Sequence, residues 1–186
     1  MSHATEPRIL FLLTGSIACY KACELVSRLV KRGCAVQTVA SAGALRFVGE
    51  ATLEGLTGRP AFTDVYRSGQ VMDHIRLARW ADAALLCPAT ANSLNRLAAG
   101  LANDAIGALY LAWEIATKPW LIAPAMNSTM WDHPATRASR QVLAAHGARL
   151  LPVGEGSLAC GESGEGRLLE IADIEAELLK AIGTPR

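Results

Sequence analysis

The 186-residue sequence lacks long apolar runs and lacks an excess of charge of either sign. Its uncharged apolar stretches, such as residues 9–13 and 83–87, are far shorter than the ~20 residues that span a bilayer. The 18 basic and 17 acidic residues give a net charge of +1, and no basic run is present. Because nucleic acids and acidic membranes require clustered Lys and Arg, we expect neither as a primary partner, and we expect no membrane helix.

The sequence also lacks a secretion signal and paired cysteines. Residues 1–8 form a polar tail that reaches Ile9 without a basic flank followed by an apolar core. The five cysteines are an odd number and do not have the close spacings of a zinc site or a disulfide framework. We therefore expect a cytoplasmic protein with reduced thiols and no metal site. The cysteines are Cys19, Cys23, Cys34, Cys87 and Cys160.

Short apolar runs alternate with segments of helical period along the chain. The expected strands cover residues 9–14, 35–40, 83–87, 120–123 and 149–153. The expected helices cover residues 17–32, 51–56, 93–99, 105–116, 135–145 and 171–182. This alternation predicts an α/β fold, with a doubly wound parallel sheet between two helical layers in a single domain of residues 9–183.

Polar residues follow the first strand, at the end where doubly wound sheets bind ligands. Gly15 would let the backbone approach a ligand, and Ser16 could cap the following helix and hold a phosphate against its amino terminus. The second and third glycines of the G-x-G-x-x-G fingerprint are missing, which argues against a dinucleotide and mildly for a mononucleotide. An ordinary helix cap is the plainer interpretation of this turn alone.

Two later turns have similar chemistry. The segment PATANS, residues 88–93, places hydroxyls and an amide at the start of a helix, where they suit a phosphate or a polar ring edge. The segment PAMNSTMW, residues 124–131, follows the next strand. Its Met and Trp side chains would by default fill the core, but Asn127 could bind a carboxylate or an amide.

His74 and Cys160 are the two candidates for proton transfer. His74 lies between a glycine-bearing segment, residues 66–73, and an expected buried strand, where it could cap a helix or act as a base near neutral pH. Cys160 lies in residues 154–166, a glycine-rich segment that we expect to be a mobile loop. A cysteine in such a place favours a reactive thiol over a packing role.

Five segments in this order resemble the flavin-dependent (FMN) cysteine decarboxylases, over residues 9–169. They are GSIACYK at 15–21, HIRLARWAD at 74–82, PATANS at 88–93, PAMNSTMW at 124–131 and ACGESGEGR at 159–167. The resemblance implies a Rossmann-like, flavodoxin-like fold with FMN as cofactor. It departs from the family at Asn103-Asp104, where these proteins commonly have two aspartates, and we expect that change to affect packing or subunit contacts.

The resemblance also implies residue roles. The residues implied to hold FMN are Gly15, Ser16, Ile17, Ser41, Thr90, Asn92, Ser93 and Ala125. His74 would be the catalytic base, and Cys160 would be the catalytic proton donor. The residues implied to bind substrate are Asn127, Arg79, Met130 and Ala159.

Within the family the likeness is strongest to enzymes that convert 4'-phosphopantothenoylcysteine to 4'-phosphopantetheine in coenzyme A biosynthesis. That reaction oxidises the substrate thiol to a thioaldehyde, releases CO2 and reduces the resulting enethiol. The alternatives are a decarboxylase of a peptide's carboxy-terminal cysteine, a non-catalytic regulatory FMN-binding relative and a flavin prenyltransferase. Cys160 argues against the first, because a product left as an enethiol needs no final proton donor.

The likeness also implies partners. We expect a homotrimer or a dodecamer of trimers, and the helix expected at 105–116 is apolar on more than one face, as a subunit contact requires. A helix enclosed in the core of a monomer is the other interpretation. Bacterial members are usually fused to a phosphopantothenoylcysteine synthetase domain, whereas this sequence stops at Arg186. We therefore expect either a separate synthetase chain or an enzyme of a different pathway.

Overall fold

The computed structural model describes residues 6–69, 71–157 and 163–183. Its main sheet is parallel, with the strand order β2-β1-β3-β4-β5. The strands are β1 (Arg8–Leu13), β2 (Ala35–Ala40), β3 (Ala83–Ala89), β4 (Trp120–Pro124) and β5 (Arg149–Leu150). This is the flavodoxin-like order, so the predicted fold class is confirmed. The order reverses between β1 and β3, which marks the expected ligand position.

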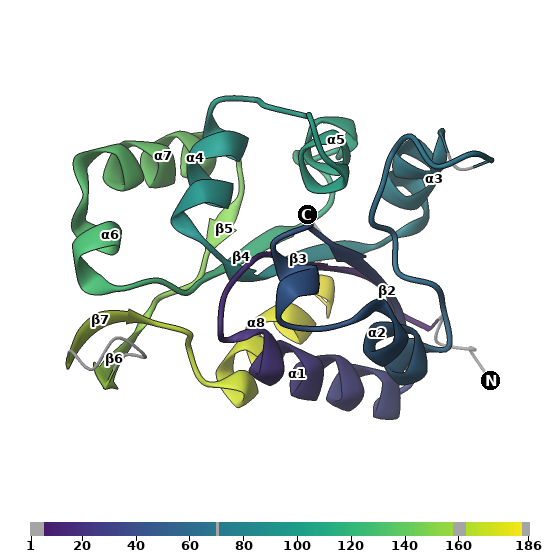
Figure 1. The fold of residues 1–186 in the computed structure, drawn as a ribbon, viewed down its shortest axis with the longest axis horizontal. Helices are drawn as coiled ribbons and strands as arrows, with labels where there is room; N and C mark the ends of the chain where they lie inside the picture. Colours follow the sequence, from purple (N-terminus) through teal and green to yellow (C-terminus); the bar gives the residue numbers. More distant parts are fainter. Residues whose placement is uncertain (1–5, 70, 158–162, 184–186) are drawn as a thin grey trace.

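Helices cover both faces of the sheet (Figure 1). One layer contains α1 (Cys19–Lys31), α2 (Glu50–Thr57) and α8 (Ile171–Gly183). The other contains α3 (Asp73–Trp80), α4 (Ala91–Ala98), α5 (Ala105–Ala112) and α7 (Pro134–Ala145), with the short helix α6 (Ser128–Asp132) beside it. Among the described residues, none of the helices is long and apolar enough to cross a membrane.

Strand β1 shows why the strands have uninterrupted apolar sequences. Ile9, Phe11 and Leu13 are fully buried against the layer of α1 and α8. Leu10 and Leu12 are fully buried in the other core, beneath α3, α4 and α5. Successive side chains of a strand point to opposite faces, so a strand covered on both faces is apolar at every position.

Most of the expected elements begin or end one to four residues away from the observed ones, and the strand expected at 149–153 is only Arg149–Leu150. Helix α1 begins at Cys19 rather than at residue 17, because Ser16 Oγ accepts a hydrogen bond from the Ala18 N–H at 3.2 Å within a preceding turn. Helix α5 ends at Ala112 rather than at residue 116, since Trp113 is extended and packs edge-on against Trp120. Strand β1 begins one residue early, at Arg8.

The sequence did not predict the 3-10 helix η1 (Ala44–Arg46), nor three larger elements. Two are the helices α3 and α6. The third is an antiparallel hairpin of β6 (Gly154–Ser157) and β7 (Ser163–Arg167), found in the segment expected to be a mobile loop. Residues 158–162, which include Ala159 and Cys160, lie outside the described residues.

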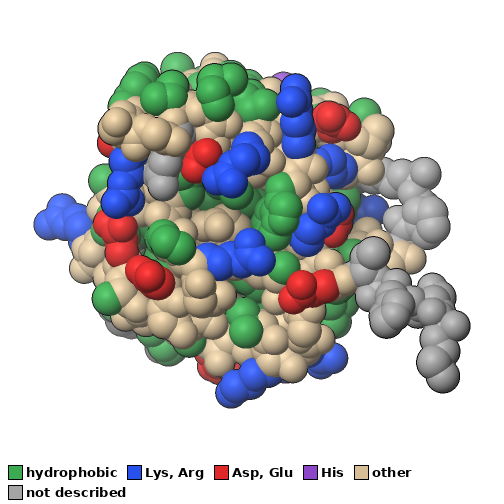
Figure 2. All heavy atoms as spheres, turned by 90° about the vertical axis from the view of Figure 1, so that its right-hand side faces the viewer, with side chains coloured by type: hydrophobic (Ala, Val, Ile, Leu, Met, Phe, Trp, Pro, Cys, Tyr) green, Lys and Arg blue, Asp and Glu red, His purple; other side chains and the backbone are tan. Residues whose placement is uncertain are grey.

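The side of the molecule that carries α2 and α3 has charges of both signs. Basic and acidic side chains lie among one another there, with apolar side chains between them (Figure 2). On that face neither sign gathers into a single field of the kind that steers a polyanion or a polycation.

Candidate cofactor and active site

A polar pocket of about 510 Å³ lies at the carboxyl ends of β1, β2 and β3, where the strand order reverses. Six of the sequence-predicted site residues line it: Gly15, Ser41, Thr90, Asn92, Ser93 and Met130. The sequence-predicted sites did not include six further lining residues: Thr14, Ala42, Gly43, Arg96, Asn103 and Asp104.

Thr14 connects the two central strands at this pocket. Its side-chain hydroxyl donates to the Pro88 carbonyl at 2.6 Å and accepts from the Thr90 N–H at 3.1 Å. Thr90 in turn caps α4, because its Oγ1 accepts from the Ser93 N–H at 3.3 Å and lies 3.0 Å from Ser93 Oγ. The chain of hydroxyls fixes the start of α4 against the end of β1.

Two glycines bring the turns after β1 and β2 together. A Cβ atom added to Gly15 would lie 3.1 Å from the backbone of Gly43. Ser41 Oγ accepts from the Ala44 N–H at 3.2 Å, so it caps the short turn that follows β2. This wall of the pocket therefore consists of backbone and hydroxyl groups, which a phosphate or a ring edge can approach closely.

Arg96 and Asp104 form a second wall. The guanidinium of Arg96 donates to Asp104 Oδ2 at 2.9 Å and also contacts the side-chain oxygen of Asn103. The other oxygen of Asp104 caps α5, since it accepts from the Gly107 N–H at 2.8 Å. An Asp just before a helical pattern is a cap signal, and it could have indicated this residue from sequence.

Asn127 lies at the end of β4 and caps α6. Its Oδ1 accepts from the Met130 N–H at 2.9 Å. With the oxygen engaged in the cap, the side-chain NH2 is the group that can donate to a ligand carboxylate. Ala125, two residues earlier, is buried, and its N–H donates to the Ala89 carbonyl at 2.9 Å.

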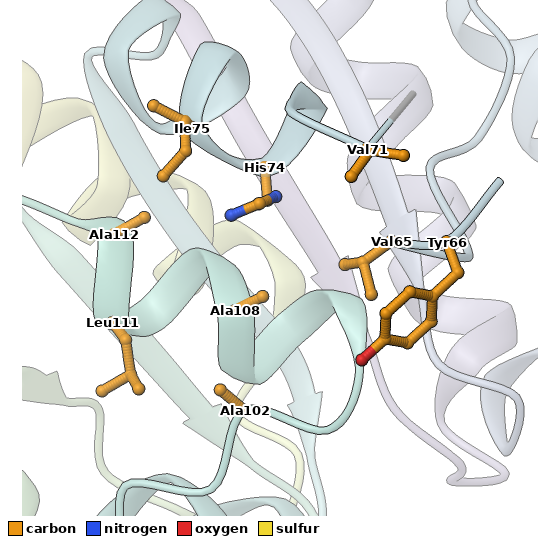
Figure 3. Close-up of a pocket in the computed structure, with 9 residues that line it drawn as sticks. All are labelled: Val65, Tyr66, Val71, His74, Ile75, Ala102, Ala108, Leu111 and Ala112. Carbon is orange, nitrogen blue, oxygen red and sulfur yellow. The ribbon is translucent and has the colours of Figure 1, made fainter. Parts of the chain in front are cut away.

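His74 lies in the first turn of α3 and lines a different pocket, of about 440 Å³. Its ring points from α3 toward Ala108 and Ala112 of α5 (Figure 3). The Nδ1 atom is buried, and within the described part of the chain it has no hydrogen-bond partner. Apart from His74 and Tyr66, the lining residues are apolar: Val65, Val71, Ile75, Ala102, Ala108, Leu111 and Ala112.

The two pockets have no lining residue in common. Helices α3 and α6 lie at opposite ends of their layer, with α4 and α5 between them (Figure 1). One copy of the chain therefore does not bring His74 and Arg79 together with Asn127 and Met130. Arg79 is exposed, and its carbonyl accepts from Lys118 Nζ at 3.3 Å.

Two further cofactor candidates, Ser16 and Ile17, lie in the turn before α1 and differ in exposure. Ser16 is half-buried and its hydroxyl is engaged in the turn before α1, whereas Ile17 is 58% exposed.

Among residues 6–69, 71–157 and 163–183, no cluster of His, Cys, Asp and Glu could hold a metal ion. Burial raises the pKa of the thiols of Cys19, Cys23 and Cys34, so they lack the thiolate character of a reactive cysteine.

The Flavoprotein family model matches residues 1–183. The chain therefore belongs to the Flavoprotein family. This result agrees with the sheet order and with the position of the polar pocket.

Curated relatives of this Flavoprotein member include longer proteins. The coenzyme A biosynthesis bifunctional protein CoaBC of Bacillus subtilis (strain 168) is 42% identical over 168 residues, which cover 89% of this chain and 41% of that protein. The CoaBC protein of Vibrio cholerae is 40% identical over 178 residues, covering 95% of this chain and 44% of that protein. The chain thus spans less than half the length of these relatives.

Solved structures match the chain along nearly its whole length. A cysteine-to-serine variant of PPC decarboxylase, complexed with pantothenoylaminoethenethiol, is 28% identical with a TM-score of 0.82, covering 94% of this chain and 97% of that one. The FMN-dependent cysteine decarboxylase SpaF is 30% identical with a TM-score of 0.76, covering 94% and 97%.

Proposed function

We propose that this Flavoprotein domain, residues 9–183, is an FMN-dependent decarboxylase that converts 4'-phosphopantothenoylcysteine to 4'-phosphopantetheine in coenzyme A biosynthesis. The observation that carries the proposal is the polar pocket at the β1–β3 reversal, which gathers six residues of the resemblance from four separate segments. The similarity to CoaBC proteins and to PPC decarboxylase supports the same substrate.

The groups at this pocket fit FMN. Gly15 and Gly43 present backbone, and Ser41, Thr90 and Ser93 present hydroxyls, at the helix start where a phosphate is favoured. Asp104, an acid in the lining, is paired with Arg96 and so repels a phosphate less than a free carboxylate would. We propose that Ser16, Ile17, Asn92 and Ala125 complete the cofactor contacts. Bound FMN would take two electrons from the substrate thiol and later return them.

The hydrogen bonding of two side chains, Asn127 and His74, supports the proposed substrate contacts. The NH2 group of Asn127 would bind the substrate carboxylate, because Asn127 Oδ1 is engaged with Met130 N. His74, whose Nδ1 is buried without a partner among the described residues, would take the proton of the substrate thiol. Arg79, Met130 and Ala159 would line the substrate, and Cys160 would donate the final proton.

We propose that two copies of the chain build each site, in a homotrimer or a dodecamer of trimers. Separation of the His74 pocket from the polar pocket in one copy supports this assembly. Apolar side chains around the His74 pocket are exposed, with Tyr66 at 78%, Val71 at 55% and Leu111 at 58%. A second copy presenting its polar pocket would cover them. We also propose a cytoplasmic location and a phosphopantothenoylcysteine synthetase as partner.

Mass spectrometry tests the proposal directly. The purified protein should be yellow and should release FMN, not FAD, on denaturation. Incubation with 4'-phosphopantothenoylcysteine should yield a product lighter by CO2. Turnover of a peptide with a carboxy-terminal cysteine, but not of 4'-phosphopantothenoylcysteine, would favour the peptide-decarboxylase alternative. A colourless protein that takes up no FMN would contradict both.

A further inference from the structure

We infer that Gly166 is a positioning residue for Asn127: its bare Cα lets strand β7 lie directly against the turn that carries the substrate-binding amide. The inference rests on the proposed role of Asn127 for its effect on catalysis. The packing of Gly166 against that turn is a property of the chain itself and can be tested without substrate.

The turn after β4 is held from two sides by backbone hydrogen bonds. The Ala125 N–H donates to the Ala89 carbonyl of β3 at 2.9 Å. The next N–H, that of Met126, donates to the Gly166 carbonyl of β7 at 2.9 Å. Asn127 follows at once, so its backbone position is set by β3 on one side and by the hairpin on the other.

Only glycine fits at position 166. A Cβ atom there would lie 2.4 Å from the carbonyl oxygen of Met126 and 3.3 Å from the carbonyl carbon and oxygen of Asn127. These are backbone atoms, so the turn itself would have to move. The φ angle of Gly166 is +122°, a conformation that other residues rarely adopt. A second glycine of β7, Gly164, packs in the same way, with its Cβ position 3.1 Å from Ser128 Oγ.

A displaced turn would move the amide of Asn127. Its Oδ1 is tied to the Met130 N–H at 2.9 Å, and its backbone carbonyl accepts from the Trp131 N–H at 3.0 Å, so side chain and helix α6 move together. A shift of about 1 Å in a group that orients a substrate can cost about 100-fold in rate. Gly166 does not itself line the polar pocket, and it is thus placed to act on substrate binding through Asn127.

The chain contains a matched control for the test. Gly156 lies in the partner strand β6 with a similar φ of +132°, but the nearest atom to its Cβ position is Arg167 Nη1, at 3.5 Å. Gly166→Ala and Gly156→Ala therefore impose comparable backbone strain on one hairpin, and only the first presses on the Asn127 turn. We expect Gly166→Ala to raise the KM for 4'-phosphopantothenoylcysteine roughly tenfold or more. Gly156→Ala should leave the KM within about twofold of wild type.

Hydrogen exchange of the FMN-bound protein gives a readout independent of activity. Peptides covering residues 124–131 should exchange faster in Gly166→Ala than in wild type, because the Met126 N–H loses its acceptor, and Gly156→Ala should not differ. A double-mutant cycle in substrate affinity pairs Gly166→Ala with Asn127→Ser, which keeps a cap oxygen and removes the NH2 donor. Once the amide is gone, Gly166→Ala should weaken substrate binding little further.

Equal exchange of residues 124–131 in the two alanine variants would overturn the inference, as would an unchanged KM in Gly166→Ala. If wild type releases no CO2, the proposed function fails, and the exchange comparison still decides whether Gly166 positions the turn. If Gly166→Ala does not fold, Gly164→Ala replaces it. That variant should raise the exchange of residues 124–131 by a smaller amount, since the Ser128 side chain can rotate, and no rise would overturn the inference.

Discussion

Thr14 Oγ1 and the backbone of Thr90 are joined by a hydrogen bond of 3.1 Å that ties the end of β1 to the start of α4. Thr14 is 2% exposed, and the same hydroxyl donates to the Pro88 carbonyl. One buried hydroxyl therefore joins the ends of β1 and β3 at the polar pocket. Thr14 is a structural support of the pocket as well as part of its lining.

Replacing Thr14 by Val should destabilise both the fold and the cofactor site. The change keeps the shape of the side chain but leaves the Pro88 carbonyl and the Thr90 N–H unpaired, which should lower the free energy of unfolding by about 1–3 kcal/mol. FMN should also bind more weakly, because the α4 start is no longer fixed. Urea unfolding and quenching of flavin fluorescence measure the two effects. Thr14→Ser keeps the hydroxyl and should resemble wild type; equal losses in both variants would contradict the argument.

The separation of His74 from Asn127 leads to a complementation experiment. His74→Asn and Asn127→Asp should each abolish the first half-reaction, so that the flavin stays oxidised after substrate is added. Asn127→Asp retains an oxygen for the Met130 N–H, so helix α6 should survive while a like charge faces the carboxylate.

Co-expression of the two variants should restore activity. If each site takes His74 from one copy and Asn127 from the next, random assembly of a cyclic oligomer leaves roughly one quarter of the sites intact. The rate of CO2 release per flavin measures this fraction. A chain with both substitutions, co-expressed with either single variant, is the control and should give none. Failure of the single variants to complement in a verified mixed oligomer would show that each site lies within one copy.

The sequence predicted the sheet well because its strands are buried on both faces. Residues 35–40 and 83–87 show neither the alternation of polar and apolar residues of an exposed strand nor the apolar period of a surface helix. The structure places both segments in the sheet, with every residue buried. Helix α6 was missed because it has only five residues. Helix α3 is as long as α4, but Met72 at its start makes no side-chain cap of the kind that Thr90 provides for α4. The hairpin was missed because its glycine-rich sequence has the composition of a loop.

The site was predictable in part for a similar reason. Residues that follow strands, such as Ser41 and Thr90, converge wherever parallel strands end, so their order in the sequence is enough to group them. Arg96 lies in the second turn of α4, and its approach to Asp104 depends on how two helices pack. The separation of His74 from the polar pocket likewise depends on the tertiary structure, and sequence order gives no sign of it.

Ionisation of Tyr110 should lower the free energy of unfolding at alkaline pH. Its ring packs edge-on against Trp120, its hydroxyl lies 3.0 Å from His146 Nδ1, and burial raises the pKa of Tyr110 to about 12. A phenol in the unfolded chain ionises near pH 10, so the folded value is the higher one. The stabilisation linked to Tyr110 is therefore complete below about pH 10 and is lost as the pH rises toward 12.

Comparison with Tyr110→Phe isolates this effect. Phe cannot ionise, so the difference in unfolding free energy between wild type and variant should shrink between about pH 9 and about pH 11. Denaturant unfolding at the two pH values measures the difference, and the ultraviolet absorbance of phenolate, taken as wild type minus variant, reports the ionisation itself. A constant difference in free energy, or a difference absorbance that titrates at pH 10 in the folded protein, would rule the coupling out.

Cys160→Ser should separate the two halves of the reaction. A hydroxyl is a far weaker acid than a thiol, so the variant should still release CO2 but should not protonate the enethiol. The product expected by mass spectrometry is two hydrogens lighter than 4'-phosphopantetheine, and the solved cysteine-to-serine variant of PPC decarboxylase holds a compound of this type, pantothenoylaminoethenethiol. Cys23→Ser makes the same change at a half-buried position of α1 and should give 4'-phosphopantetheine as wild type does. If Cys160→Ser also forms 4'-phosphopantetheine at the wild-type rate, Cys160 is not the proton donor, and the main argument against a peptide substrate is lost.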